Sequence, residues 1–215
     1  MMQFESKILQ KRFLSRDTFV LRLERHHMKF RAGQYVVIDL NGDSREYSLY
    51  SGEEDPFIEV LIRRIENGNI SQKLSQLEVG EMVKIEGPYG FFVINPEDIS
   101  EKKLVFLATG TGIAPFRSYV RSLNGLDYFL LHGTRNISEA YEHESYERDR
   151  LIFCTSRENG SDYKGRVTEY FRKYMKTDNH TIYYLCGNSE MIEEMAGYLE
   201  EHDIDPFFIR SEEFF

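Results

Sequence analysis

The sequence predicts two domains, an antiparallel β-barrel followed by an α/β domain with a parallel sheet. The first half contains closely spaced short runs rich in Val, Ile, Tyr and Phe, separated by turn signals. After about residue 96, apolar strand-like runs alternate with amphipathic segments, as in a parallel sheet flanked by helices. A polar segment around Pro96 interrupts both patterns, so the barrel domain is expected at 1–96 and the α/β domain at 97–215.

The barrel strands are expected at five short runs, several of which alternate apolar and polar residues. These runs read FVLRLER, GQYVVIDL, REYSLYS, FIEVLIRRI and EMVKIEG. Turn signals such as Asn-Gly-Asp at 41–43 separate them. One helix is expected after Gly68. Its apolar residues Ile70, Leu74 and Leu77 recur at the spacing of one helical face.

The α/β domain is expected to contain four strands, in the runs LVFLA, DYFLLH, LIFCTS and TIYYLCG. The amphipathic segments that predict helices read FRSYVRSL, SEAYEHESYE, RVTEYFRKY and EMIEEMAGYLE. In an open sheet of this kind, ligands bind at the carboxyl ends of the strands. Functional residues are therefore expected where these runs end.

Composition indicates a folded soluble protein and argues against several functional classes. Of 215 residues, 41% are hydrophobic and 29% are charged, a balance that suits a packed core. No run approaches the roughly 20 apolar residues of a membrane span, and the first residues carry charges where a secretory signal has its apolar run. Two cysteines are too few for a disulfide framework or a four-thiolate iron–sulfur cluster. A reducing cytoplasm is the expected location, and no metal site is expected.

The net charge of −9 argues against nucleic acid as a general partner, but the charge is unevenly distributed. Residues 1–31 carry eight Lys or Arg and only three Asp or Glu. This segment is either a solvated strand face or a docking surface for an acidic partner. The sequence leaves both interpretations open.

A glycine-rich turn connects a predicted strand to a predicted helix at residues 109–115. Gly110 and Gly112 allow a tight turn and a close approach of the backbone to a pyrophosphate. The helix that follows offers free N–H groups to that anion, and Pro115 suits an early helical position, where no N–H is needed. Alone, such a turn fits a structural role equally well.

Other polar residues lie where a ligand could reach them. Three arginines are expected at strand or loop ends: Arg135, Arg157 and Arg166. On a predicted barrel strand, alternation sends Arg45 and Tyr47 to one face and Ser48 to the other. His132 is expected to pack at the end of the sheet without a catalytic role.

Taken in order along the chain, these motifs resemble those of the ferredoxin–NADP reductase family, especially its bacterial ferredoxin- or flavodoxin-reducing branch. The resemblance covers essentially the whole chain: RxYS, a GxxS helix start, GPxGxF, TGTGIAP, HGxR, SRE, GRV, CGN and a C-terminal aromatic pair. Any one motif could arise by chance, whereas the ordered set is specific. The resemblance implies a barrel that binds FAD and an α/β domain that binds NADP(H).

The resemblance implies flavin-binding roles in the barrel domain. Arg45 would bind the FAD phosphates, Tyr47 would stack on the isoalloxazine and Ser48 would lie near its N5. The residues matching the helix start that receives the pyrophosphate are Gly68, Ile70 and Ser71. Phe214 would cover the second flavin face, where the family usually has Tyr, and Phe215 would reach the adenosine part of FAD.

The resemblance also implies roles on the nicotinamide side. The residues matching the family's NADP loop are Gly110, Thr111 and Gly112. The residues matching its 2′-phosphate motifs are Ser156, Arg157 and Arg166. Arg135 would contact the cofactor nearby. Cys186 matches the residue beside the nicotinamide, and Glu212 would join Ser48 and Cys186 near the hydride path.

The implied function is electron transfer between NADP(H) and a small acidic carrier, ferredoxin or flavodoxin. Hydride transfer to flavin N5 needs no protein nucleophile, so Ser48, Cys186 and Glu212 are expected to position and polarise the ring edges. Two alternatives stay open: a reductase of free flavin, and an electron-transfer subunit of a larger complex. The C-terminal aromatic pair argues against the first, and the lack of a four-cysteine motif argues against the second.

Overall fold

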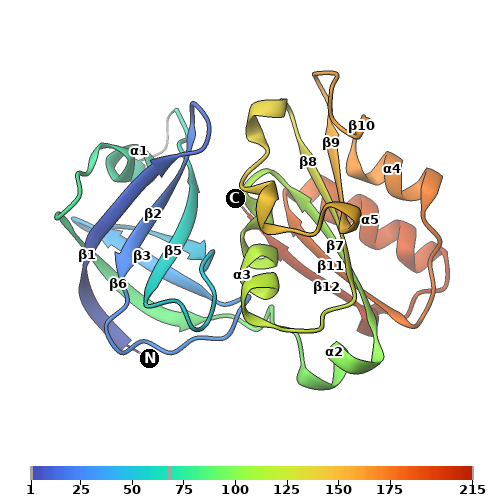
Figure 1. The fold of residues 1–215 in the computed structure, drawn as a ribbon, viewed down its shortest axis with the longest axis horizontal. Coiled ribbons are helices and arrows are strands. Elements are labelled where there is room, and N and C mark those ends of the chain that lie inside the picture. Colours follow the sequence, from blue (N-terminus) through green and yellow to red (C-terminus); the bar gives the residue numbers. More distant parts are fainter. Residues whose placement is uncertain (1, 67–68, 215) are drawn as a thin grey trace. The chain divides into compact units, whose positions relative to one another are not determined.

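The computed structural model describes residues 2–66 and 69–214, which form two compact units (Figure 1). The first unit contains the residues up to Val93 together with Ala114–Ser122. The second contains Ile94–Ile113 and the residues from Leu123 onward. Each unit has its own sheet and its own hydrophobic core. The expected domain boundary at residue 96 stays a prediction. The helix at 114–122, which follows that boundary in the sequence, packs with the first unit.

Six antiparallel strands form the sheet of the first unit, in the order β4-β3-β6-β1-β2-β5. Their bounds are β1 Met2–Phe13, β2 Thr18–Glu24, β3 Tyr35–Leu40, β4 Asp43–Ser48, β5 Phe57–Arg63 and β6 Met82–Tyr89. A bridge between Leu49 and Val60 joins the chain after β4 to β5, the two edges of the sheet. The sheet therefore closes on itself, which confirms the expected antiparallel barrel.

Alternating side chains of the strands fill this barrel. Phe19, Leu21 and Leu23 of β2 belong to the barrel core, as a period of two predicts. Helix α1 (Asn69–Gln76) contributes its apolar face to the same core through Ile70 and Leu74. The helix expected after Gly68 is confirmed.

Strand β1 is an element that the sequence pattern does not predict. Its fully buried residues are Ser6 and Ile8, and the partly buried Phe4 packs against the same core, so only two apolar side chains mark its inner face. The remaining positions are largely charged or polar and partly or fully exposed. Its pairing with β2 and β6 provides the order that the local sequence does not indicate.

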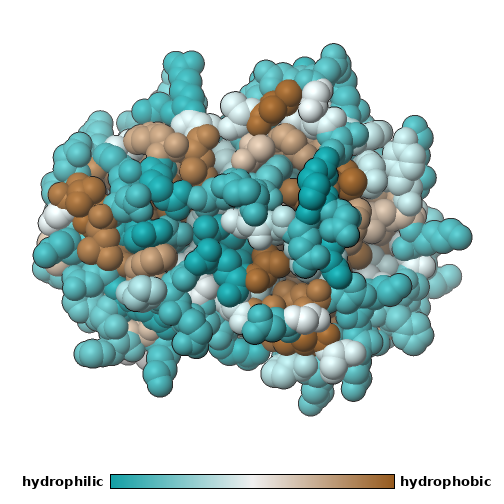
Figure 2. All heavy atoms as spheres, in the orientation of Figure 1, coloured by the Kyte–Doolittle hydropathy of each residue, from teal (hydrophilic) through white to brown (hydrophobic). Residues whose placement is uncertain are grey.

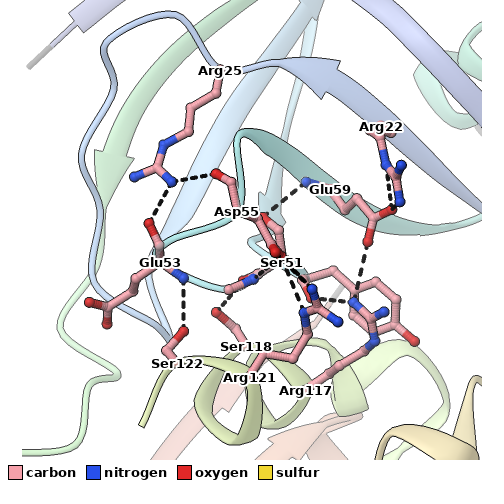
Figure 3. Close-up of polar contacts among 12 residues, drawn as sticks. Arg22, Arg25, Ser51, Glu53, Asp55, Glu59, Arg117, Ser118, Arg121 and Ser122 are labelled. Atoms are coloured by element: carbon pink, nitrogen blue, oxygen red, sulfur yellow. Dashed lines mark hydrogen bonds and ion pairs between the residues drawn. The ribbon is translucent and has the colours of Figure 1, made fainter.

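Helix α3 (Ala114–Ser122) packs within the first unit through a set of polar contacts (Figure 3). Ser118 Oγ donates a hydrogen bond to the carbonyl oxygen of Ser51 at 2.7 Å. Arg121 forms an ion pair with Asp55, with Nη2 2.7 Å from Oδ1 and 2.9 Å from Oδ2. These bonds fix the helix to the loop that precedes β5.

The carboxylate of Glu59 on β5 lies among these contacts and is 1% exposed (Figure 3). Its Oε1 accepts hydrogen bonds from Arg12 Nη2 and Arg22 Nε, each at 3.0 Å. Its Oε2 lies 3.3 Å from Arg117 Nη1. Arg117 is itself buried and donates to the carbonyl oxygen of Tyr50 at 2.8 Å. Three guanidinium groups thus compensate one buried negative charge.

The second unit contains a parallel sheet in the order β10-β9-β8-β7-β11-β12. The strand bounds are β7 Lys103–Thr109, β8 Tyr128–Thr134, β9 Leu151–Thr155, β10 Tyr163–Lys164, β11 Thr181–Gly187 and β12 Ile209–Glu213. Its helices are α2 Pro96–Glu101, α4 Val167–Tyr174 and α5 Ser189–Glu201. Every pair of neighbouring strands is parallel, which confirms the predicted α/β sheet.

The prediction of a helix at SEAYEHESYE, residues 138–147, is wrong. This segment contains separate 3₁₀ turns at Ile137–Glu139 and His143–Ser145. Glu142 lies between them in the left-handed conformation, with a φ of 47°, which interrupts a right-handed helix. The buried aromatic residues of the segment, Tyr141 and Tyr146, are five positions apart, a spacing that does not place them on one helical face.

On the face drawn in Figure 2, hydrophilic residues predominate and hydrophobic ones form separate patches. Among the helices of the described residues, none is both long and apolar enough to cross a membrane.

Candidate functional site

The strand order of the second sheet marks a place where a ligand would bind. From β7 the strands follow one another outward on one side as β8, β9 and β10, and the chain then crosses back to place β11 on the other side of β7, so the strand order reverses there. In open α/β sheets, ligands bind beyond the carboxyl ends of the strands at such a switch point. The chain has a 3₁₀ turn at Gly110–Ile113 directly after β7, and β11 ends at Cys186 and Gly187.

Two glycines at this point have no room for a side chain. A Cβ on Gly112 would lie 2.3 Å from the carbonyl oxygen of Cys186. A Cβ on Gly187 would lie 2.1 Å from Thr109 Oγ1. Gly110 differs, because a Cβ there would meet nothing within 4 Å, and its φ of +55° is left-handed. The turn therefore packs against β11 at Gly112 and has open space at Gly110. A pyrophosphate could approach its backbone at Gly110.

Hydrogen bonds hold the start of helix α5 at the same edge of the sheet. The Asn188 N–H donates to Thr109 Oγ1 at 3.0 Å. Asn188 Oδ1 accepts from the N–H of Met191 at 3.2 Å and so caps the helix. The positive end of the α5 dipole therefore lies beside the turn after β7, where it favours an anion.

Cys186 and Glu212 are neighbours in the sheet, because the parallel register of β11 and β12 pairs them. Cys186 is fully buried, and this burial, followed by the charge of Glu212, raises the pKa of its thiol well above the usual value. The thiol is therefore protonated at neutral pH and is not an activated nucleophile. Two of the three residues expected near the hydride path thus lie together. The third, Ser48, is buried in the first unit.

Exposed arginines lie at the carboxyl ends of β8 and β9. Arg135 follows β8, and Ser156 and Arg157 follow β9. The Arg157 N–H donates to the carbonyl oxygen of Arg135 at 3.0 Å, so the backbone holds the two together. Within residues 2–66 and 69–214, neither of these two arginine side chains forms an ion pair. This edge can therefore bind an anion.

Arg166 belongs to the same edge, since the N–H of Gly165 donates to the carbonyl oxygen of Thr155 at 3.0 Å. The Arg166 guanidinium pairs with Glu190 at 2.9 Å, and the two side chains are 56% and 67% exposed. An exposed pair of this kind contributes about 1 kcal/mol or less. A phosphate can therefore replace Glu190 as the partner of Arg166 at little cost.

In the first unit, β4 carries the RxYS motif. Arg45 is exposed and Ser48 is buried. Tyr47 packs against the barrel core, and its buried hydroxyl has no hydrogen-bond partner among the described residues. Burial raises the pKa of Tyr47 to about 12, against the opposing effect of Arg45. Because buried polar groups are normally paired, this hydroxyl fits a partner supplied by a ligand.

The expected pyrophosphate site at the start of α1 is described only in part. Gly68 lies outside the described residues. Ile70 is buried in the barrel core, and Ser71 Oγ accepts a hydrogen bond from the N–H of Ile65 at 3.1 Å. Ser71 is thus held close to the turn before the helix, with its hydroxyl hydrogen still available to donate.

The aromatic pair at the chain end is also described in part, since Phe215 lies outside the described residues. Phe214 is partly exposed and directly follows β12. Its N–H donates to the carbonyl oxygen of Gly187 at 2.8 Å, which extends the pairing of β12 with β11. Phe214 is therefore held at the switch-point edge of the second sheet.

The basic segment at residues 1–31 is partly neutralised inside the first unit. Arg12 and Arg22 bind Glu59, as described above. Lys11 Nζ donates to the carbonyl oxygen of Ser75 at 3.0 Å. These three side chains stabilise the barrel. If the segment binds an acidic partner, its other basic residues must provide the contacts.

A pair of histidines also belongs to the site, although the sequence indicates only a packing role for His132 and gives no signal for His143. His132 Nε2 lies 2.9 Å from the carbonyl oxygen of Gly110, in the turn after β7. His132 Nδ1 lies 2.7 Å from His143 Nε2. The only hint in the sequence is the position of His132 near the end of a predicted strand.

Family models match both halves of the chain. An oxidoreductase FAD-binding domain matches residues 5–94, and an oxidoreductase NAD-binding domain matches residues 106–196. The matches follow the order expected from the motifs. The expected binding of FAD and of a nicotinamide dinucleotide is thereby confirmed.

Curated relatives carry names of electron-transfer proteins. The toluate 1,2-dioxygenase electron transfer component of Pseudomonas putida is 28% identical over 226 residues, covering 94% of this chain and 65% of the relative. The cyanelle ferredoxin–NADP reductase of Cyanophora paradoxa is 30% identical over 206 residues, covering 76% of this chain and 56% of the relative. The chain thus spans less than two thirds of the length of these relatives.

A solved structure shares the architecture. A ferredoxin NADP+ reductase from Neisseria gonorrhoeae with bound FAD and NADP superposes with a TM-score of 0.88 at 23% identity, covering 100% of both chains. At this identity the likeness shows the fold alone. It confirms the arrangement of a barrel followed by an α/β sheet.

Proposed function

Because the chain belongs to the ferredoxin–NADP reductase family of FAD- and NAD(P)-binding oxidoreductases, we propose that it transfers electrons between NADP(H) and ferredoxin or flavodoxin. The observation that carries this proposal is the open turn at Gly110–Ile113, which lies at the switch point of a sheet edged by exposed arginines. The FAD-binding match of the other unit supplies the second half of an electron-transfer chain.

The flavin would be held by residues of the barrel. Bound FAD supplies a ring that accepts a hydride and releases electrons singly. Arg45 would bind the phosphates by charge-assisted hydrogen bonds. The ligand would supply a partner for the Tyr47 hydroxyl, which has none among the described residues, and the Tyr47 ring would stack on the isoalloxazine. The start of α1 would offer N–H groups to the pyrophosphate, at Gly68, Ile70 and Ser71.

Residues near the reacting rings would position them rather than react. Ser48, Cys186 and Glu212 would orient and polarise the ring edges, and the raised pKa of the Cys186 thiol is consistent with a neutral group. Phe214 would cover the second flavin face and exclude water, and Phe215 would reach the adenosine part of FAD. None of these residues needs to become a nucleophile.

The preference for NADP(H) over NAD(H) would come from the cationic edge of the second sheet. Arg157 and Arg166 would bind the 2′-phosphate together with Ser156, and Arg135 would contact the cofactor nearby. Hydrogen bonds between charged partners are the strongest of their kind in proteins, since both donor and acceptor are ionised. NADH offers no such phosphate to these groups.

An anaerobic titration of the purified protein with NADPH, and separately with NADH, tests this proposal. Bleaching of a bound flavin by NADPH in preference to NADH is the expected result. Equal bleaching by both would contradict the role of the arginines. A protein that purifies without flavin and does not bind added FAD would contradict the proposal as a whole.

The acceptor and its setting are further parts of the proposal. Ferredoxins and flavodoxins are typically acidic, so basic residues such as Lys7, Arg16 and Lys29 would speed the encounter between this protein and its carrier. The cytoplasm is the expected location of this reaction. Reduction of purified carrier should then slow as ionic strength rises. A rate that is flat from low to high salt would contradict this docking surface.

The similarity to the toluate dioxygenase component favours a second candidate function. That relative aligns over 94% of this chain, so this chain could equally deliver electrons to an oxygenase. Co-purification of a stable partner from its own cells would support this second function over a free carrier. Loss of reduced flavin on gel filtration would instead support a reductase of free flavin.

A further inference from the structure

Two hydrogen-bonded histidines, of which His132 is buried and His143 is partly exposed, lie against the turn that would bind the dinucleotide. His132 on β8 is 0% exposed, and His143 belongs to the 3₁₀ turn His143–Ser145. The rings form a chain of hydrogen bonds in which His143 Nε2 lies 2.7 Å from His132 Nδ1, and His132 Nε2 lies 2.9 Å from the Gly110 carbonyl oxygen. The chain ends at the first residue of the open turn.

The chemistry of these atoms fixes where the hydrogens lie. The Gly110 carbonyl oxygen can only accept, so His132 Nε2 carries a hydrogen. His132 Nδ1 is then the acceptor of a neutral ring, and His143 Nε2 must donate to it. Both rings therefore occupy the Nε2–H tautomer: the Gly110 carbonyl fixes the tautomer of His132, and His143 supports it by donating to Nδ1.

The surroundings keep both rings neutral. Burial, followed by the proximity of His143, lowers the pKa of His132 to about 3. Burial also lowers the pKa of His143 to about 4, although Asp162 raises it and Arg148 lowers it further. At neutral pH neither ring carries a charge, so the directions of donation do not change.

Aromatic packing fixes the orientation of the two rings. Phe153 on β9 stacks on His132 with ring centroids 5.9 Å apart and planes 25° apart. The same ring meets His143 edge to face, at 4.6 Å and 84°. Neither histidine can rotate away from its hydrogen bond without losing this contact.

The orientation of the Gly110 carbonyl has a consequence for the next N–H. In a trans peptide the C=O and the following N–H point in opposite directions. Because the Gly110 C=O points to His132, the N–H of Thr111 points away from the histidine pair. This N–H lies in the first turn of the 3₁₀ helix, where donors have no acceptor within the helix.

From this geometry we propose that His132 and His143 are positioning residues for dinucleotide binding. They hold the Gly110–Thr111 peptide so that its N–H faces the cofactor phosphates. The proposal deepens the proposed function and depends on it, because the phosphates are those of NADP(H). His132 and His143 touch neither the phosphates nor the reacting rings, and they act through the backbone of the turn.

Variants that differ in one hydrogen-bond donor test this role. His132→Gln keeps an N–H donor near the position of Nε2, whereas His132→Leu removes it. The dissociation constant for NADP+ should rise about three- to tenfold in His132→Leu and stay within about twofold of wild type in His132→Gln. The matched control is His180→Leu, at an exposed histidine, which should leave the dissociation constant for NADP+ unchanged.

Two further measurements separate positioning from general damage. Adenosine 2′-phosphate contacts the arginine edge but has no pyrophosphate, so its affinity should be the same in all variants. In the wild-type protein, nitrogen NMR of the imidazole rings should report the Nε2–H tautomer for both His132 and His143. His143→Phe tests the second histidine separately, at a partly exposed position. Because it removes the hydrogen bond to His132, it should weaken NADP+ binding by about threefold.

Each opposite result is decisive. Equal NADP+ affinity in His132→Leu, His143→Phe and wild type would overturn the positioning role alone. The same conclusion follows if His132→Gln is as weak as His132→Leu, if adenosine 2′-phosphate weakens in parallel, or if His132 shows the Nδ1–H tautomer. A wild-type protein that binds no NADP+ would overturn the proposed function and this proposal with it.

Discussion

Replacing Glu59 by glutamine should strongly destabilise the protein. The carboxylate accepts from Arg12 and Arg22 at Oε1 and faces Arg117 at Oε2. Glutamine has one acceptor and one donor at the same positions. Its amide nitrogen must therefore point N–H groups at the guanidinium of either Arg117 or the other two arginines, and a buried positive charge loses its compensation.

The size of the effect follows from the exposure of each partner. Arg117 is buried, so its charge-assisted bond contributes about 1.5–3 kcal/mol. The side chains of Arg12 and Arg22 are 26% and 32% exposed, so water screens them and each contributes about 0.2–1 kcal/mol. The total loss is about 2–5 kcal/mol. At about 2–4 °C per kcal/mol for a chain of this size, Tm should fall by about 4–20 °C.

Thermal unfolding followed by circular dichroism measures this change. The matched control is Glu54→Gln, an exposed glutamate in the loop that precedes β5, which should stay within about 0.5 kcal/mol of wild type. A Tm of Glu59→Gln equal to that of the control would refute the reasoning. Combining Glu59→Leu with Arg117→Met should recover part of the loss, because it removes both buried charges together.

Three further predictions concern the cofactor sites. Arg157→Ala should raise the KM for NADPH about tenfold to a hundredfold and leave that for NADH unchanged, and equal losses would contradict its role. Cys186→Ser should slow flavin reduction in stopped-flow without changing FAD content. The native Cys186 thiol should resist alkylation at pH 8, as measured by mass, because its raised pKa keeps it protonated. Tyr47→Phe should weaken FAD binding several-fold and leave the flavin-free protein at least as stable, since it removes a buried hydroxyl that has no partner among the described residues.

The sequence predicts the elements whose own residues carry the signal. Apolar runs located β2, β5 and the central strands of the second sheet, because these are buried along their length. The turn at Gly110–Ile113 was predicted from its glycines, and Gly112 proves to have no room for a side chain. The parallel pairing of Cys186 with Glu212 agrees with their expected proximity.

Features that depend on distant partners could not be predicted. Strand β1 has only Phe4 and Ile8 as apolar residues on its inner face and is ordered by its pairing with β2 and β6. The environment of His132 depends on His143, eleven residues away across a segment whose local pattern indicates a helix. Glu59 looks like an exposed strand residue until the three arginines are placed around it.

The position of helix α3 limits how this chain can be divided into working fragments. Its nine residues lie between two segments of the second unit in sequence but pack within the first. An expressed fragment ending at Val93 would lack Ser118 and Arg121, and it would leave the carbonyl oxygen of Ser51 and the carboxylate of Asp55 without these partners. A fragment beginning at Ile94 would carry the same helix without Phe92, against which Phe116 and Tyr119 pack. A chimera that takes the barrel from one relative and the α/β unit from another should therefore take Ala114–Ser122 from the same relative as the barrel.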